Sequence, residues 1–171
     1  MRNAFKVVFA IVFTAAVAAF PANAAFLRHA IAAYNRQDFV RAAADFLDLA
    51  RHGNAKAQTY LGFMYSTGRG VPQNYVLAAD WYLCAAEQGE PQAQYLLGQL
   101  YNKGHGVPED YVEAHKWLNL AAAHAPRSFR DASKRLRDAV ATKMTRRQLA
   151  ESRWRAVEWA PHRLPCEEAD F

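Results

Sequence analysis

Apolar residues in the middle of the chain recur at helical spacing, in two blocks with a turn between them. Ala57, Leu61 and Tyr65 lie four residues apart in the first block, and Ala78 and Trp81 lie three residues apart in the second. One face of an α-helix repeats every three to four residues, so each block predicts an amphipathic helix. The sequence shows no alternation typical of strands. We therefore expect an all-α protein.

The same pattern returns after 36 residues. Identical residues recur at this shift for Ala57, Leu61, Gly62, Tyr65, Gly68, Gly70, Val71, Pro72, Tyr75, Ala78, Trp81, Ala85 and Ala86. A weaker half-unit over residues 39–53 precedes them. Self-similarity at a fixed period is typical of repeat proteins, in which each helix pair buries its apolar face only by stacking on its neighbours. The pattern predicts an α-solenoid.

A glycine-rich segment separates the two helices of each unit. In residues 68–72, Gly-Arg-Gly-Val-Pro, the glycines can take positive φ angles and the proline stops the helix. The second unit has Gly104-His105-Gly106 at the same place. A phosphate-binding glycine loop would follow a strand, and none is predicted. The repetition therefore indicates a turn that serves the architecture.

Small residues stand where the two helices of a unit are expected to cross. Gly62 and Ala78 would let the helices approach closely. The large side chains of Trp81, Tyr65 and Tyr75 would then fill the gaps between helices. We expect these aromatic residues in the core.

These landmarks resemble the Sel-one-like repeat (SLR) family, a branch of the tetratricopeptide-type α-solenoids. The family pattern is Ala-x3-Leu-Gly-x2-Tyr-x2-Gly-x-Gly-Val, followed by Ala-x2-Trp-x3-Ala-Ala-x2-Gly. The unit from Ala57 to Gly89 matches every landmark, and the unit from Ala93 matches until Ala125 replaces the closing glycine. The resemblance implies an α–α superhelix of antiparallel, tetratricopeptide-like helix pairs that binds a protein or peptide partner.

The repeat degenerates toward the C-terminus. Leu136 and Val140 imitate a first helix, but Arg137 stands where glycine belongs, so close helix crossing is not expected there. Thr145 followed by Gln148 is typical of a capping box that begins a second helix. We predict a degenerate C-terminal capping helix pair.

The N-terminus has the three parts of a secretory signal peptide. Arg2 and Lys6 precede an apolar run over residues 7–20, and Ala22 and Ala24 form an Ala-x-Ala cleavage site. The run is too short to span a bilayer comfortably. We expect cleavage after Ala24, no stable membrane insertion, and a periplasmic or secreted bacterial protein. The expected parts are a signal peptide at 1–24, half-repeat helices at 25–56, repeat one at 57–92, repeat two at 93–126, capping helices at 127–160 and a tail at 161–171.

Charge is spread unevenly. Residues 25–125 carry 8 basic and 9 acidic side chains, whereas residues 126–163 carry 11 basic and 4 acidic ones. The overall balance of +5 does not indicate nucleic-acid binding. The C-terminal excess predicts either a solvated cap face or a basic patch toward an anionic partner, such as an anionic envelope surface. This basic patch comprises Arg127, Arg130, Lys134, Arg137, Arg146 and Arg147.

One stripe of the first helices is not claimed by the repeat core. Its residues are Tyr60, Phe63 and Thr67 in the first unit, and Leu96, Gln99 and Lys103 in the second. Spacings of three and four place them on one helix face. In the architecture that the chain resembles, first helices line a concave groove, so this stripe is a candidate partner-binding surface. Packing against neighbouring helices is the alternative for its apolar members.

The two cysteines allow two interpretations. In an exported chain Cys84 and Cys166 could form one disulfide. Cys84 equally fits a core position, because Leu120 stands at the equivalent place in the next unit.

Patterns typical of catalysis or metal binding are missing from the sequence. No His-x3-His or Gly-x-Ser-x-Gly spacing occurs. His162 and Cys166 are the one close His–Cys pairing, in the expected tail. We predict no enzyme, no cofactor and no metal site, and we expect a protein-binding adaptor or scaffold. A structural subunit of an envelope assembly is the alternative, and a small cell-wall hydrolase is a more distant one.

Overall fold

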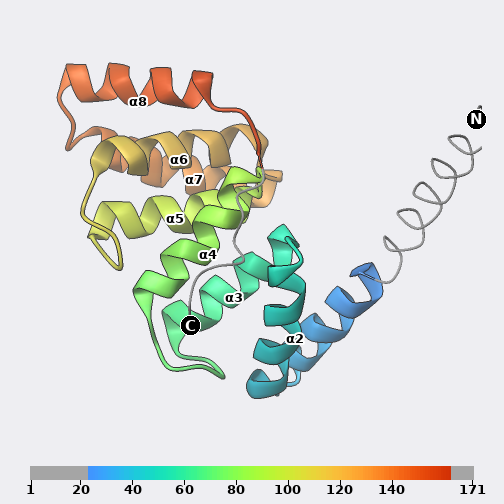
Figure 1. The fold of residues 1–171 in the computed structure, drawn as a ribbon. Helices are drawn as coiled ribbons and strands as arrows, with labels where there is room; N and C mark the ends of the chain where they lie inside the picture. The colour runs from blue at the N-terminus through green and yellow to red at the C-terminus, as the bar shows by residue number, and fades with distance from the viewer. Residues whose placement is uncertain (1–22, 163–171) are drawn as a thin grey trace, which may run out of the picture.

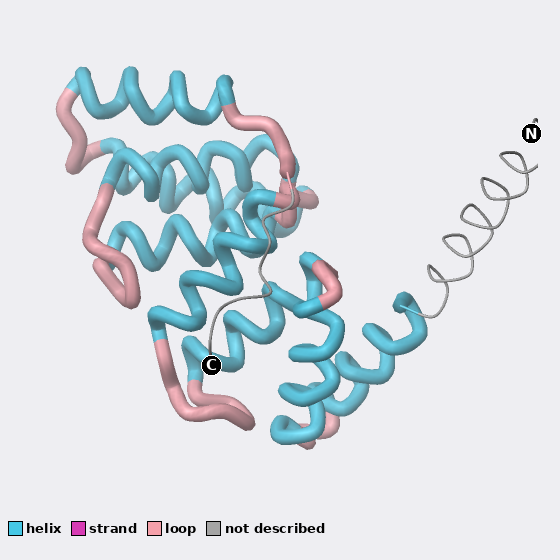
Figure 2. Tube along the Cα trace, in the orientation of Figure 1, coloured by secondary structure: helices cyan, strands magenta, loops and turns pink. Residues whose placement is uncertain are grey.

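The computed structural model describes residues 23–162, which form eight helices and no strand (Figure 1, Figure 2). The first helix covers residues 23–35. The others are α2 (Phe39–Arg51), α3 (Ala55–Thr67), α4 (Tyr75–Glu87), α5 (Pro91–Lys103), α6 (Tyr111–His124), α7 (Arg127–Ala141) and α8 (Arg146–Glu158). The predicted all-α class is confirmed.

Polar caps and glycines set the ends of the repeat helices. The side chain of Asn54 accepts a hydrogen bond from a backbone N–H of α3, and Asn74 and Asp110 do the same for α4 and α6. Such caps satisfy N–H groups that have no partner within the helix. Gly68 and Gly104 end α3 and α5 at φ angles of 70° and 65°, a conformation that glycine adopts without strain.

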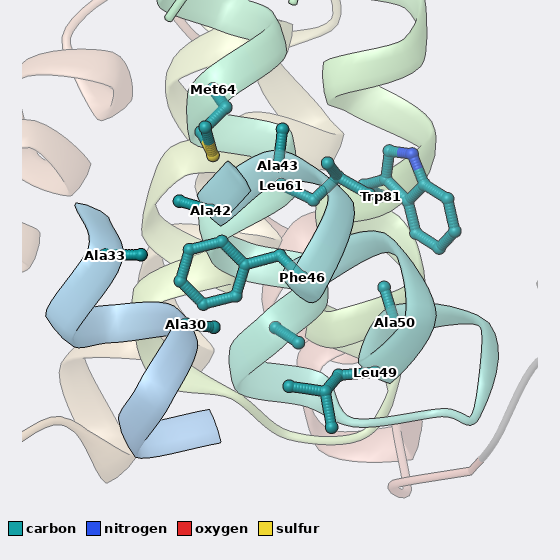
Figure 3. Packing of buried hydrophobic residues seen from close by; sticks show 11 residues of the cluster. Ala30, Ala33, Ala42, Ala43, Phe46, Leu49, Ala50, Leu61, Met64 and Trp81 are labelled. Atoms are coloured by element: carbon teal, nitrogen blue, oxygen red, sulfur yellow. The ribbon is translucent and has the colours of Figure 1, made fainter. Parts of the chain in front are cut away.

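Consecutive helices pack as pairs, and the pairs stack into a solenoid (Figure 1). α3 pairs with α4 and α5 with α6, while α2 stacks on α3 and α4 on α5. In the first core cluster, Phe46, Leu61 and Trp81 lie close together (Figure 3). Trp81 and Trp117 are each 1% exposed. The predicted solenoid and its two core tryptophans are therefore confirmed.

The two helices of each repeat cross at a glycine. A Cβ atom on Gly62 would lie 2.7 Å from the ring of Tyr82, and one on Gly98 would lie 2.8 Å from Leu118. Both would also lie 3.1 Å from a backbone oxygen of the partner helix, that of Ala78 or Ala114. These distances leave no room for a side chain. The expectation that small residues allow close crossing is confirmed in both repeats.

Each glycine-rich turn rests on the start of the second helix of the preceding pair. A Cβ atom on Gly70 would lie 2.3 Å from the Phe39 carbonyl oxygen, and one on Gly106 would lie 2.1 Å from that of Tyr75. The turns therefore join neighbouring helix pairs, in agreement with the predicted architectural role of the glycine-rich segments. The expectation that Tyr75 lies in the core is wrong. At the first residue of α4 it is 36% exposed and packs on the ring of His105 in the turn.

The C-terminal helices pack differently from a repeat. The capping box of Thr145 and Gln148 begins α8, as predicted. Both α7 and α8 pack against α6, and α8 lies across the end of the solenoid (Figure 1). At the position where the repeats have glycine, the Arg137 guanidinium donates to Asn119 and Asp138. The cap is thus two helices laid on α6, with no glycine crossing between them.

Candidate binding groove

Two adjoining cavities, each of about 190 Å³, open between the first helices of three successive pairs. They share Thr59 and Tyr60 of α3 and Gln92 of α5. One extends to Tyr34 and Phe63, and the other extends to Ile31, Lys56 and Glu90. We call this surface the groove. Because residues 23–35, α3 and α5 are the first helices of successive pairs, the groove runs along the stacking direction of the solenoid.

Aromatic rings form the floor of the groove. The ring of Tyr60 stacks on that of Phe46 at 4.7 Å and meets that of Tyr34 edge-on at 5.7 Å. Burial raises the pKa of the Tyr60 hydroxyl, and the nearby Tyr34 raises it further. Its hydroxyl is therefore a neutral hydrogen-bonding group at physiological pH, on a ring that the core holds in place.

Arg69 contacts two residues at one end of the groove, Tyr34 and Phe63. From the turn after α3, its guanidinium donates a hydrogen bond of 2.7 Å to the Tyr34 hydroxyl. The guanidinium carbon also lies 5.6 Å from the ring centroids of both Phe39 and Phe63. A cation over aromatic faces is an attractive arrangement. Arg69 thus holds Phe63 in place and supplies positive charge at this end.

The other end of the groove is polar. Burial raises the pKa of the Glu90 carboxyl, and the nearby Lys56 ammonium partly offsets that increase. Thr59 donates its hydroxyl proton to the Ala55 carbonyl at 2.8 Å. This end therefore offers one anionic and one cationic group beside the aromatic floor, which suits the mixed polar and apolar character of a peptide.

The predicted stripe is only partly in the groove. Tyr60 lines both cavities and Phe63 lines one of them. Thr67 is exposed and donates to the carbonyl of residue 63. Leu96 packs against the core cluster that contains Leu97 and Trp117, and Gln99 donates to the Tyr95 hydroxyl. Lys103 is exposed at the last residue of α5. The stripe in the second unit therefore lies outside the two cavities.

Sequence reasoning missed the other groove residues, which are Ile31, Tyr34, Lys56, Thr59, Glu90 and Gln92. One signal was available. Lys56 and Gln92 lie 36 residues apart, in the first turns of equivalent helices. A comparison of repeat positions that differ, rather than those that agree, would have pointed to this pair. Ile31 and Tyr34 precede the recognisable repeat, so the periodicity carried no information about them.

The basic patch comes from two helices. Arg127, Lys134, Arg146 and Arg147 are exposed. Arg130 donates to the carbonyl of residue 125 at the end of α6, and Arg137 has the two partners given above. Two of the six predicted residues, Arg130 and Arg137, thus make hydrogen bonds within the chain.

A serine and a histidine meet in the contact between α6 and α8. Ser152 Oγ lies 2.9 Å from His115 Nδ1, and the two residues are 0% and 4% exposed. Burial, together with the nearby charges of Arg137 and Arg153, lowers the pKa of His115 to about 4. No substrate could reach so buried a pair, so we assign it a structural role.

Metal-binding and membrane-spanning features are not found in the part of the chain that the structure describes. Among residues 23–162, no three His, Cys, Asp or Glu side chains gather in a way that could hold a metal ion. None of the helices described is long and apolar enough to cross a bilayer. Cys84 is half-buried in α4, while Cys166 lies outside the described residues, so the disulfide stays a prediction.

Comparison with known proteins finds similarity to Sel1 repeat proteins. A family model described as Sel1 repeat matches residues 55–90 and 91–125. The structure is similar to a protective antigen of uropathogenic Escherichia coli with an SLR fold, at a TM-score of 0.73 and 28% identity over 80% of this chain. It is also similar to a Sel1 repeat protein from Oxalobacter formigenes, at a TM-score of 0.54 and 37% identity over 57% of this chain. The chain spans 29% and 39% of the lengths of these two proteins. No curated protein matches it.

Proposed function

We propose that this chain, which contains two Sel1 repeats at residues 55–90 and 91–125, is a non-catalytic adaptor that binds an extended peptide segment of a partner protein in the groove. Sel1 repeat solenoids generally mediate protein–protein interaction and generally serve as scaffolds. The observation that carries the proposal is the pair of adjoining cavities on three successive first helices.

The composition of the groove supports a peptide as the ligand. Tyr34, Tyr60 and Phe63 offer apolar area together with hydroxyl groups, and such rings are the usual anchors of protein interfaces. Lys56 and Glu90 stand at the polar end. Because the cavities adjoin, a ligand that fills both must be elongated, which favours a peptide over a compact small molecule.

The test begins with crosslinking of the exported protein in cells and mapping of the crosslinked peptides. Binding of the captured peptide is then titrated against variants. Phe63→Ala should weaken binding at least ~30-fold, equivalent to about 2 kcal/mol, as central aromatic anchors do. Tyr60→Phe is the gentler change, because it keeps the stack on Phe46 and removes only the hydroxyl.

The chain offers a matched control for this titration. Gln99 stands 36 residues after Phe63, at the equivalent position of α5, and lies outside the cavities. Gln99→Ala should leave the affinity within about twofold. Equal affinity of the Phe63→Ala variant and the wild type, with helical content unchanged in both, would contradict binding in the groove.

We further propose that the protein acts in the periplasm after removal of residues 1–24. The support is the sequence pattern of Arg2, Lys6, the apolar run and the Ala-x-Ala site, since residues 1–22 lie outside those described. N-terminal sequencing of protein from the periplasmic fraction should give Ala25 as the first residue. A first residue of Met1 in folded, cytoplasmic protein would contradict export.

A further inference from the structure

The outward face of α8 carries an apolar ridge. Trp154 is 63% exposed and Val157 is 80% exposed, and Ala150 is exposed beside them. Their spacings of four and three place the three side chains on one helix face. Ser152 and Ala156, on the opposite face, are buried against α6. The ridge therefore points away from the body of the protein. Helix α8 itself is the outermost helix at this end of the solenoid (Figure 1).

Arginine side chains flank the ridge on both sides. At 100° per residue, Arg146 and Arg153 fall on one side of the line through Ala150, Trp154 and Val157, and Arg147 falls on the other. All three arginines are exposed. No acidic residue falls between the ridge and these arginines, and Glu158 lies beyond Arg147 at the end of the helix.

Other exposed apolar residues do not form such a group. Phe26, Val40, Tyr75 and Val76 are exposed on residues 23–35, α2 and α4. Single exposed apolar residues are normal on protein surfaces, whereas neighbouring ones with a tryptophan indicate a contact surface. Only on α8, among the described helices, do exposed tryptophan, valine and three exposed arginines share one face.

We propose that this face of α8 binds the surface of an anionic lipid bilayer. Tryptophan prefers the boundary between headgroups and acyl chains, and arginine is attracted to anionic headgroups. An apolar stripe with basic flanks is typical of helices that lie in the plane of a membrane surface. The preceding helix α7 also carries exposed Arg127, Arg130 and Lys134.

The size of the face favours a lipid surface over a protein partner. A helix of 13 residues is about 20 Å long and about 10 Å wide, so its outer face offers on the order of 200 Å². A stable protein interface buries about 800 Å² per partner, with matched shape. A lipid surface needs no matched shape, and weak insertion of one tryptophan adds to the electrostatic attraction.

The lipid-binding face and the groove lie on different elements. The groove is built from residues 23–35, α3 and α5, and the face from α8. The adaptor can therefore hold a peptide while it rests on a membrane. This inference stands independently of the peptide proposal, because each surface has its own variants.

The test is partitioning of the processed, exported chain onto vesicles, measured by co-sedimentation. Vesicles of phosphatidylcholine with phosphatidylglycerol should bind the protein, and vesicles of phosphatidylcholine alone should bind it at least tenfold more weakly. Trp154→Ala should reduce partitioning about tenfold. Arg147→Gln and Arg153→Gln should each reduce it about fivefold. The emission of Trp154 should shift to the blue on binding, and Trp154→Phe should abolish that shift.

Matched controls come from exposed residues elsewhere. Val40→Ala and Arg41→Gln on α2 remove an exposed valine and an exposed arginine far from α8 in sequence, and neither should change partitioning. Partitioning that is independent of phosphatidylglycerol, or that survives Trp154→Ala, would overturn the proposal. The proposal would also be overturned if the protein bound no vesicles and instead crosslinked to an acidic protein partner, with that crosslink lost in the Trp154→Ala variant.

Discussion

The two repeats and the C-terminal cap are both helical, but their helices pack in different ways. In the repeats, glycine crossings bring helices into close contact around buried tryptophans. In the cap, Ala156 and Trp159 pack on the core around Trp117 without such a crossing, and polar contacts also join this segment to the solenoid. Ser152 meets His115 at 2.9 Å, and Arg155 donates to Glu113 at 2.7 Å. The close glycine crossing recurs from one repeat to the next, whereas each of these polar contacts occurs once.

This difference explains why α8 lies where it does. A second helix normally crosses its first helix at the glycine, and α7 has Arg137 at that position. Without a close crossing on α7, α8 packs on α6. There Ser152 contacts the buried His115, and Arg155 donates to the Glu113 carboxylate. The helix that ends the solenoid thereby turns its other face to solvent, and the proposed lipid-binding face arises from that placement.

The largest effect that separates the two regions should come from their tryptophans. Trp81→Ala and Trp117→Ala remove side chains that are 1% exposed and should each destabilise the fold by about 3–5 kcal/mol. The matched control is Trp154→Ala in the cap, where the side chain is 63% exposed and the loss should stay within about 0.5 kcal/mol. Chemical denaturation measures all three. Equal losses in repeat and cap would contradict the comparison.

The next effect concerns a covalent link from the tail to the repeats. The N–H of His162 donates to the Glu87 carbonyl at 2.7 Å, and the Trp159 indole donates to the Glu87 carboxylate at 2.7 Å. The chain after α8 therefore returns to the end of α4, one turn from Cys84. Cys166 follows His162 by four residues, which span at most ~14 Å. We propose that the two cysteines form a disulfide.

Removal of this disulfide should cost about 2–4 kcal/mol, because the link restricts the unfolded chain. The measurement is denaturation of the exported protein with and without reductant, with Cys166→Ser as the variant. Reductant should lower the stability of the wild type and leave the variant unchanged. Thiol titration of unfolded, unreduced protein should detect no free thiol, and detection of two would show that Cys84 is a reduced core residue.

A smaller effect should come from the glycine crossings. Gly98→Ala places a Cβ 2.8 Å from Leu118 and 3.1 Å from the Ala114 oxygen. Overpacking of this kind typically costs about 1–3 kcal/mol, which should outweigh the ~1 kcal/mol gain in helix propensity. At the equivalent position of the cap, Arg137→Ala should change stability by less than about 1 kcal/mol. A stabilising Gly98→Ala would show that the helices can move apart freely.

The sequence allowed prediction of the features that recur in both repeats, and of few of the features that occur once. The helix pairs, the glycine turns and the buried Trp81 and Trp117 followed from a pattern that occurs twice. Tyr75 was misplaced, because an aromatic residue shared by both units can pack on a turn as well as in a core. In the groove, Tyr60 and Phe63 were predicted, but contacts such as Arg69 with Phe63 join distant parts of the chain, and no local spacing encodes them.

The last prediction tests the polar contact that holds the cap, through its dependence on pH. His115 has a pKa of about 4 in the folded protein, below its ordinary value of 6.5. Its main cause is burial, and the ring contacts Ser152 in the interior. Between pH 6.5 and 4 the unfolded chain therefore binds a proton at this ring that the folded chain does not bind. Stability is at its full value above pH 6.5 and falls as pH decreases toward 4.

The loss at pH 5 relative to pH 7 should be about 1–2 kcal/mol. His115→Gln removes the titrating group and should lower stability at pH 7 while making it less dependent on pH between 7 and 5. Trp117→Ala, in the repeats, should lower stability by the same amount at both values. Denaturation at the two pH values gives the difference directly. If His115→Gln kept the full acid dependence of the wild type, the weak point at low pH would lie outside the contact between α6 and α8, and polar burial would not distinguish the cap from the repeats.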